Sequence, residues 1–163
     1  MRRGLQAAGL VVVLASAALP VRGAEGPPTV GIWAGAGHLE AEVAATPEAR
    51  HRGLMGREYL DPDRAMLFVW PREGPRVFWM KDTRIPLSVA FLDGQGRVLN
   101  VEGMQPLRED RFYGSQGGAR FALEANRGWF RRYGVERGNR LRFRIPAKLL
   151  PGDREEDLTV GSP

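Results

Sequence analysis

The residues best placed to do chemistry form one short run, Trp79-Met80-Lys81-Asp82-Thr83. The run brings an indole, an ammonium, a carboxylate and a hydroxyl close together. If it forms part of a strand, side chains alternate, and Trp79, Lys81 and Thr83 share one face. Met80 and Asp82 then lie on the other face. An indole beside an ammonium and a hydroxyl predicts a surface that recognises a carboxylate, a phosphate or a sugar.

The charged residues near this run also have a structural interpretation. A buried ammonium must be paired, so Lys81 would contact a carboxylate such as Glu124. Arg57 could instead grip an anion bidentately beside Lys81. It could equally stabilise the fold by pairing with Asp61, Asp82 or Glu124. Both interpretations stay open, and the candidate ligand-binding residues are Arg57, Trp79, Lys81, Asp82, Thr83 and Glu124.

Catalytic templates find little support in the sequence. The absence of cysteine removes disulfides, thiol catalysis and Cys-ligated zinc. His38 and His51 are the only histidines, and neither Ser88 nor Ser115 lies in a nucleophile-elbow sequence. No set of catalytic residues is therefore assigned.

Carboxylates and thioethers suggest two further chemistries. Glu124 with Asp82 or Asp93 could act as a glycosidase pair, but their spacing does not separate them from paired or surface carboxylates. His51 and Met55 lie four apart on a predicted helix, and imidazole and thioether ligands suit copper(I). Methionine is also an ordinary core filler, and no closely spaced Met or His cluster exists. We expect no metal and no cofactor.

The first 23 residues predict a secretory signal peptide. Arg2 and Arg3 form its basic start, an apolar run covers residues 10–19, and small side chains lead to cleavage near Gly23. An uncleaved anchor is the alternative, but the apolar run is short for a membrane span. We expect a periplasmic or secreted protein without a membrane span after cleavage.

The charge balance argues against a nucleic-acid partner. The formal net charge is +5, and removing the three arginines of the leader leaves about +2. The remaining charges are mixed in sign along the chain, which is typical of a solvated surface. We expect a monomer whose partner is a small molecule or a component of the cell envelope.

The remaining sequence predicts a single compact α+β domain over residues 38–147. Its curled or barrel-like sheet is mostly antiparallel. Thr46 caps a helix that runs to about Met55 and ends at Gly56, and residues 128–133 form a second short helix. Apolar patterns place about six strands, at 38–44, 65–70, 77–80 with 87–92, 97–102, 119–125 and 141–145.

Three segments are expected to lack regular structure. Residues 24–37 form a flexible lead-in, and residues 148–163 form a disordered acidic tail. The loop 103–118 is either functional or a mobile crossover. In the first predicted strand, alternation puts Glu42 on the polar face.

Several motifs together resemble the DUF-192 family (domain of unknown function 192). They are TPEARHRGLMGR, MLFVW, FWMKDTRIPLSVAFLDGQGRV, ARFALEANRGWF and GVERGNRLRF. The resemblance covers about His38 to Ile145 and implies a compact β-rich domain, often exported, without an established reaction. The positions that match the family pattern are Thr46, Gly53, Leu54, Met55, Arg57, Phe78, Trp79, Met80, Lys81, Thr83, Pro86 and Glu124.

The chain departs from that family pattern in three places. Ala65 stands where the family usually has Gly, and Asn139 replaces a usual Asp. Asp82 stands where Asn is usual, which matters most because it adds a charge beside Lys81.

These observations favour an exported, non-catalytic binding or accessory domain. It would recognise an anionic small molecule, a glycan or a partner segment. The alternative is a cell-envelope hydrolase with Asp82 or Glu124 as acid/base and Lys81 as electrostatic stabiliser. A third class is a purely structural interaction module.

Overall fold

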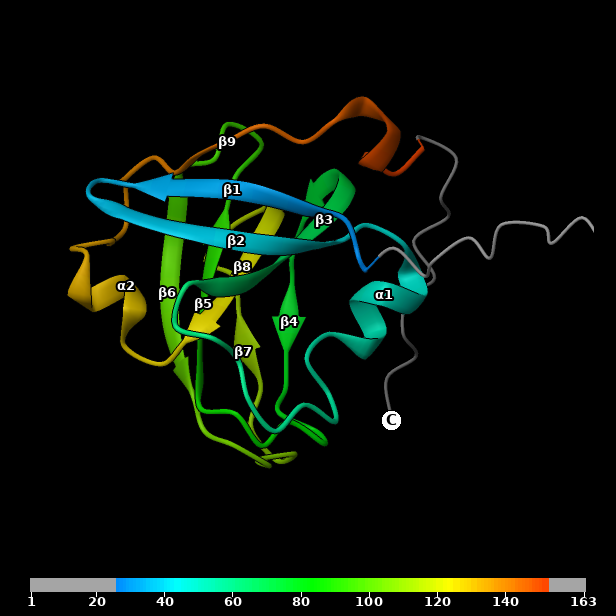
Figure 1. Ribbon diagram of the computed structural model, residues 1–163, viewed down its shortest axis with the longest axis vertical. Coiled ribbons are helices and arrows are strands. Elements are labelled where there is room, and N and C mark those ends of the chain that lie inside the picture. The colour runs from blue at the N-terminus through cyan, green and yellow to red at the C-terminus, as the bar shows by residue number, and fades with distance from the viewer. Residues whose placement is uncertain (1–25, 153–163) are drawn as a thin grey trace, which may run out of the picture.

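The computed structural model describes residues 26–152, which form a strongly curled β-sheet with two short α-helices (Figure 1). The strands of the main sheet are β1 (Thr29–Ala34), β2 (Gly37–Ala44), β3 (Arg64–Gly74), β5 (Leu87–Leu92), β6 (Val98–Met104), β8 (Ala119–Asn126) and β9 (Arg142–Phe143). Their order across the sheet is β6-β5-β8-β3-β2-β1-β9. Only β2 and β3 pair in parallel among these strands. A second, two-stranded sheet joins β4 (Val77–Phe78) to β7 (Tyr113–Gly114).

The two edges of the main sheet are joined by one segment of chain. Arg97 and Arg140 form an isolated antiparallel bridge. The Val98 N–H donates to Asn139 O at 2.8 Å, and the Leu141 N–H donates to Gly96 O at 3.0 Å. Because the same segment continues into β9, which pairs with β1, it connects the β6 edge to the β1 edge. The predicted α+β domain with a barrel-like, mostly antiparallel sheet is confirmed.

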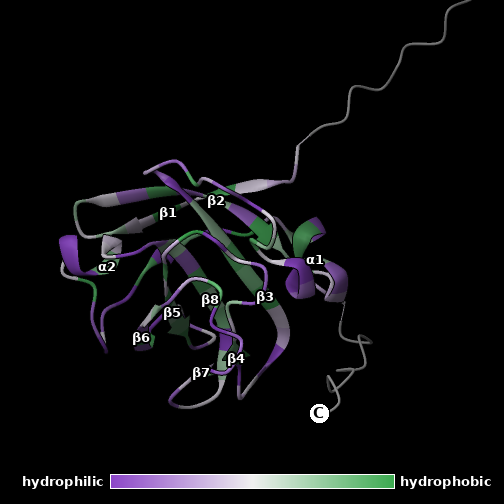
Figure 2. Cartoon of the chain, turned by 90° about the horizontal axis from the view of Figure 1, so that it is seen from below, coloured by the Kyte–Doolittle hydropathy of each residue, from purple (hydrophilic) through white to green (hydrophobic). Residues whose placement is uncertain are grey.

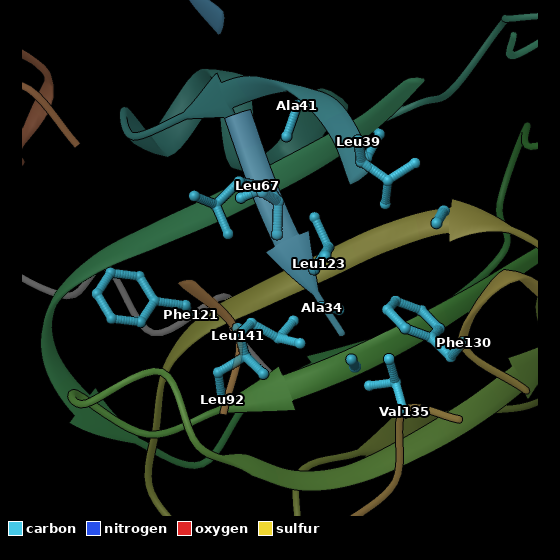
Figure 3. Close-up of a cluster of buried hydrophobic side chains, with 14 of the residues drawn as sticks. Ala34, Leu39, Ala41, Leu67, Leu92, Phe121, Leu123, Phe130, Val135 and Leu141 are labelled. Atoms are coloured by element: carbon cyan, nitrogen blue, oxygen red, sulfur yellow. The ribbon is translucent and has the colours of Figure 1, made fainter. Parts of the chain in front are cut away.

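One set of buried side chains fills the interior of this barrel and is called the inner cluster. Leu67 of β3 lies opposite Leu123 of β8, and Ala90 of β5 pairs with Leu123 on its other side. Both leucines are fully buried, and each such burial stabilises the fold by about 1.5–3 kcal/mol. Figure 3 shows that Leu67, Leu92 and Leu123 come from different strands and gather in one cluster with Phe121.

Alternate residues of the same strands face outward and form the outer cluster. Met66, Phe68, Val89 and Phe91 belong to it, although their chain neighbours belong to the inner cluster. Buried residues from the surrounding loops complete it, including Leu54, Leu60, Met80 and Ile85. Both faces of β5 are therefore covered, which explains why all of its residues are buried and all but Ser88 are apolar. Figure 2 shows hydrophobic residues along β3 and hydrophilic residues on much of α1.

The helices follow the predicted sequence signals with one difference. In α1 (Pro47–Arg52), the Ala49 N–H donates to the hydroxyl of Thr46 at 3.2 Å, which confirms the predicted cap. The helix ends at Gly53, whose φ of 48° lies in the left-handed half of backbone space, rather than at Gly56. The second helix, α2 (Trp129–Arg132), lies within the predicted range.

The structure differs from the sequence prediction in three segments that were expected to be irregular or interrupted. The segment predicted as a flexible lead-in contains β1. Alternate residues of this strand are buried, and the strand pairs with β2 across a short turn. Strand β3 continues beyond Pro71, where the register against β8 shifts and the missing proline N–H is tolerated. The loop after Gly103 contains β7, which is held by β4.

Some predictions concern residues at the two ends of the chain. The signal peptide and most of the acidic tail lie outside the described residues. The described part of the predicted tail begins within a 3-10 turn, η1 (Ala147–Leu149), and Leu149 packs against the inner cluster. Between residues 26 and 152, no helix is long and apolar enough to cross a membrane.

Candidate functional site

Three loops gather at one end of the molecule and are together called the loop face. They comprise residues 53–63, 79–86 and 105–112, and backbone hydrogen bonds join them. The Gly56 N–H donates to Asp82 O at 2.8 Å, and the Leu107 N–H donates to Thr83 O at 3.0 Å. These bonds fix the middle loop between the other two.

A surface depression of about 430 Å³ lies where the three loops meet. It is lined by Met55, Gly56, Asp82, Arg84 and Leu107. Asp82 and Leu107, with φ of 50° and 57°, are the two residues other than glycine with positive φ in the described chain. This conformation costs about 1–2 kcal/mol for most residues with a Cβ, such as Leu107, and less for Asp82, because Asp tolerates the left-handed region. Both strained residues therefore line the same depression, as is typical of functional sites.

An aromatic shelf lies beside the depression on the same loops. The rings of Trp79 and Phe112 are nearly parallel, with an interplanar angle of 12° and centroids 6.5 Å apart. Phe112 is 65% exposed. The Nζ atom of Lys81 lies 5.3 Å from the Trp79 ring centroid, which is a cation–π contact. The shelf thus combines an exposed apolar surface with a positive charge.

Lys81 and Thr83 have different roles from those that strand alternation suggested. Strand β4 ends at Phe78, so the predicted shared face of Trp79, Lys81 and Thr83 is wrong. Thr83 is buried, and its hydroxyl donates to the Lys81 carbonyl at 2.9 Å, which holds the turn. None of the ion pairs found between residues 26 and 152 includes Lys81.

Arg57 forms a bidentate ion pair with Glu42 rather than with any of the carboxylates expected from the sequence. The two nitrogen–oxygen distances are 2.6 and 2.5 Å. The hydrogen bonds from Arg57 hold the pKa of Glu42 below its ordinary value, and those to Glu42 raise the pKa of Arg57. Glu42 is buried because the outer face of β2 is covered, so its predicted solvated position is also wrong.

Glu124 lies on the outward face of β8, in one row with Glu42, Met66 and Val89. It is 5% exposed, and burial raises the pKa of its carboxyl to about 8. Two strand spacings separate Glu124 from Glu42, or about 10 Å between their backbones. Both oxygens of Glu42 accept hydrogen bonds from Arg57, and the pKa shift of neither carboxyl has the other as a cause, so the two do not form a pair that shares a proton. No ion pair among the described residues includes Glu124.

The six predicted site residues therefore divide between three locations. Trp79, Lys81, Asp82 and Thr83 share the middle loop, and of these Asp82 lines the depression. Arg57 pairs with Glu42, and Glu124 lies on the outward face of the sheet. Whether any of them binds a ligand stays a prediction. Within the described part of the chain, no group of three or more His, Asp or Glu residues is placed to hold a metal ion.

Sequence reasoning missed Phe112, Leu107 and Glu42. Phe112 and Leu107 lie in a polar segment without apolar periodicity, although an aromatic residue in such a segment is itself a signal of surface exposure. Glu42 gave no signal, because an alternating strand looks the same whether its polar face is solvated or covered by a loop.

Comparison with known families identifies the family of this chain. The model of DUF192, described as "Uncharacterized ACR", matches residues 32–143. The chain belongs to the DUF192 family. This confirms the family predicted from the motifs, and the match begins inside β1. A comparison with curated proteins finds no match.

Two solved structures resemble this DUF192 protein. One is described as a "putative transcription regulator" from Sinorhizobium meliloti, with 33% identity and a TM-score of 0.65 over 71% of this chain and 92% of the other. The second is a protein of unknown function from Novosphingobium aromaticivorans, with 29% identity and a TM-score of 0.65. That alignment covers 79% of this chain and 93% of the other.

Proposed function

We propose that this DUF192 protein is a non-catalytic binding domain that holds an anionic glycan on its loop face. The observation that carries the proposal is the shelf of Trp79 and Phe112 with the Lys81 ammonium over the indole. An exposed aromatic ring packs against the apolar face of a sugar, and an ammonium attracts a carboxylate. The ligand is therefore a sugar chain that carries carboxylates.

The neighbouring depression supplies polar groups for the rest of such a ligand. Asp82 and Arg84 line it with opposite charges, so sugar hydroxyls find both acceptors and donors there. Arg84 also contacts Glu58 at 3.5 Å, and both side chains are exposed. An exposed ion pair contributes at most about 1 kcal/mol, so a ligand can replace it at low cost.

The proposed place of action is outside the cytoplasm. The basic start, the apolar run and the small residues near Gly23 support export with removal of the leader. A chain without cysteine also has no thiol that an oxidising compartment could convert to a disulfide. N-terminal sequencing of protein recovered from the periplasm or the medium tests this part, and a chain that starts at Met1 in the cytoplasm contradicts it.

Hydrolysis by Asp82 or Glu124 has weaker support than binding. A carboxyl that keeps its proton at neutral pH suits a general acid, and Glu124 has this property. Its 5% exposure leaves little room for a substrate, whereas Asp82 is exposed on the loop. A transcriptional role also has weak support, because the charges that line the depression are of both signs.

A titration with tetragalacturonate tests the glycan proposal. The mature protein is titrated by calorimetry with this acidic tetrasaccharide and, in parallel, with its fully methyl-esterified form. We expect binding of the acid and at least about tenfold weaker binding of the ester, since a lost charge-assisted contact costs about 1.5–3 kcal/mol. Equal affinity for both forms, or no binding of either, contradicts the proposal.

The lysine content of the chain offers a matched control. Lys81 and Lys148 are its only lysines, and Lys148 lies in η1, on a different element. Lys81→Met is expected to reduce the affinity to that of the ester, whereas Lys148→Met leaves it unchanged. Equal losses in both variants would point to a general effect of net charge rather than a site.

A further inference from the structure

Residues 127–148, which include α2 and β9, carry an excess of positive charge and are called the basic edge. They comprise seven arginines, one lysine and a single carboxylate, Glu136. Residues 26–126 contain twelve basic and thirteen acidic residues. The whole excess of positive charge between residues 26 and 152 therefore belongs to this one segment. Such asymmetry within a domain indicates an anionic partner.

The basic edge runs along one side of the molecule. It starts at the turn between β1 and β2, where a Cβ added to Gly37 would lie 2.7 Å from the Tyr133 ring of α2. It then bridges to β6 through Arg140 and pairs with β1 through β9. Figure 1 shows this stretch as an orange trace that passes from α2 along the β1 edge of the sheet. Its charges are therefore spread over one side of the domain.

Alternation places the arginines around β9 on its outward side. Leu141 belongs to the inner cluster, and Phe143 and Ile145 pack against that cluster. The residues between them, Arg142 and Arg144, are exposed. Every second residue of a strand lies about 7 Å further along the same face. The two guanidinium groups therefore leave the strand on the same side and face solvent.

Carboxylates of the described chain do not pair with the basic edge. None of the ion pairs found between residues 26 and 152 includes one of its arginines or its lysine. Arg137 donates to Gln116 Oε1 at 3.0 Å, and Arg140 donates to Gln95 O at 2.8 Å. Both acceptors are neutral, so these contacts fix the side chains without compensating their charge.

Two exposed aromatic side chains accompany these charges. Trp33 of β1 is 45% exposed and lies directly opposite Arg142 of β9, so the two side chains share a face. A Cβ added to Gly31 would lie 2.5 Å from the indole, so glycine at this position leaves room for the ring to lie along the strand. Tyr133 follows Arg132 at the end of α2 and is 37% exposed. Aromatic rings beside basic side chains are typical of a surface that binds at a membrane–water interface.

We propose that the basic edge docks on a membrane surface that carries anionic phospholipids. Arg142 and Arg144 contact the headgroup phosphates, and the Trp33 indole enters the boundary between headgroups and acyl chains. The choice of lipid over nucleic acid rests on the aromatic side chains and on the proposed export. The docking itself uses other residues and another ligand than the proposed glycan site. Figure 1 shows the ends of β4 and β7, which lead into the loop face, on the side of the molecule away from β9.

Co-sedimentation of the mature protein with lipid vesicles tests the docking. The vesicles contain phosphatidylcholine with about 30% phosphatidylglycerol, and vesicles of phosphatidylcholine alone are the neutral reference. We expect binding to the anionic vesicles only, and release when about 0.5 M salt screens the charges. Absence of binding to the anionic vesicles, or equal binding to both kinds, overturns the proposal.

Two double variants with the same loss of charge locate the contact. Arg142→Gln combined with Arg144→Gln should weaken binding to the anionic vesicles about 25-fold, because each basic residue near such a surface contributes roughly a factor of five. Arg52→Gln combined with Arg111→Gln removes two exposed arginines, from α1 and from the loop face. Because these lie away from the basic edge, the second double variant should weaken binding less than about threefold. Equal losses in the two double variants overturn the proposal.

Trp33→Ala separates docking at a lipid interface from attraction to any polyanion. The substitution changes no charge and should weaken binding to the anionic vesicles about tenfold. Unchanged binding assigns the edge to polyanions in general and overturns the proposal. Release of the wild-type protein from the vesicles by a single-stranded oligonucleotide at equal phosphate concentration assigns the edge to nucleic acid and also overturns it.

Failure of this proposal is distinguishable from failure of the proposed function. The Arg142→Gln and Arg144→Gln double variant should bind tetragalacturonate as the wild type does, and Lys81→Met should bind the vesicles as the wild type does. Loss of vesicle binding by both single-site groups alike would show that the two faces are not separate and overturns the assignment to the basic edge. Because vesicle binding is measured on purified protein, its result does not depend on where the chain is exported. A thermal melt of each variant confirms that the fold is retained.

Discussion

The two faces of the curled sheet bury side chains of different chemistry. The inner cluster consists of apolar residues, and Figure 3 shows their convergence inside the barrel. The outer face carries Glu42 and Glu124, the two buried carboxylates between residues 26 and 152, among apolar neighbours such as Met66. Strands β2, β3 and β8 supply residues to both faces. The face on which a residue lies, rather than the composition of its strand, therefore decides where charge is placed.

The two faces therefore have different roles: the inner face stabilises the fold, and the outer face carries the polar groups. The interior of the barrel needs only close packing, which apolar side chains provide. The outer cluster lies under the loops that also form the depression and the aromatic shelf. A buried charge in the outer cluster costs free energy unless it is paired or neutralised. The stability of the loops that cover this cluster therefore depends on ion pairs and on the protonation of the buried carboxyls. The following predictions test this contrast in order of expected effect.

The largest effect concerns the pH dependence of Glu124. Burial raises the pKa of its carboxyl from 4.5 to about 8 in the folded state. As the pH rises between these values, the unfolded state loses the proton while the folded state keeps it. The free energy of unfolding therefore falls, on the order of 5 kcal/mol in total, and stays constant above about pH 8.

Glu124→Gln removes this dependence. Urea unfolding of wild type and variant at about pH 5 and about pH 9 gives the comparison. The two proteins should be similar in acid, and the variant should be more stable in alkali. A constant difference in free energy at both pH values would contradict the assignment of a protonated, unpaired Glu124.

Truncation of the inner cluster has the next largest effect. Leu123→Ala leaves a cavity at a fully buried position between β3 and β5, and should cost about 3 kcal/mol of unfolding free energy. Chemical denaturation measures this cost, which should not vary with pH because no ionisable group is involved. A pH-dependent cost would show that the two faces are energetically coupled.

Loss of the arginine partner of Glu42 ranks third. Arg57→Met leaves a buried carboxylate unpaired, and we expect a loss of about 2–3 kcal/mol, at or below the usual range because Arg57 is 35% exposed. The lowered pKa of Glu42 contributes stability that is present above pH 4.5 and is lost as the pH falls through the lowered value. The penalty should therefore shrink in acid, opposite to the trend of Glu124.

An exposed arginine provides the control for this variant. Arg84→Met breaks the surface pair with Glu58 and should change the unfolding free energy by less than about 0.5 kcal/mol. Thermal or urea unfolding of both variants measures the two losses of unfolding free energy. Equal costs for Arg57→Met and Arg84→Met would remove the distinction between the buried and the surface pair.

Apart from the Arg84→Met control, the smallest effect is a stabilisation. Leu107→Gly relieves the left-handed backbone at a residue that is 55% exposed, so little buried area is lost. The relief of about 1–2 kcal/mol exceeds the entropic cost of glycine, and a net gain of up to about 1 kcal/mol is expected. A calorimetric melt measures it, and a loss of stability would show that the Leu107 side chain holds the loops together.

The sequence predicted local features well where a single residue determines them. Thr46 as a cap and the turn after Asp93 follow from side chains that bond to nearby backbone, and both are observed. The barrel-like sheet follows from strand spacing. Strand β1 was missed because the Pro residues before it and the Gly residues within and after it conceal an alternating pattern, which pairing with β2 reveals.

The candidate site was less accessible to sequence reasoning, because its geometry depends on contacts between distant segments. The pair of Arg57 with Glu42 forms only after β2 is covered by the loop that follows α1. Trp79 contacts Phe112 only because β4 pairs with β7. Neither contact has a local sequence signal, whereas the run that contains Lys81 was visible from its composition alone.

Lys81→Met tests the central claim most directly, by a melting temperature and a binding constant measured on the same sample. Lys81 contacts the half-buried indole of Trp79 and forms no ion pair between residues 26 and 152, so its loss should cost no more than about 1 kcal/mol, or a few degrees in melting temperature. The account predicts that the affinity for tetragalacturonate falls to that of the methyl ester while the fold is retained. A strongly lowered melting temperature, or unchanged binding, would contradict it.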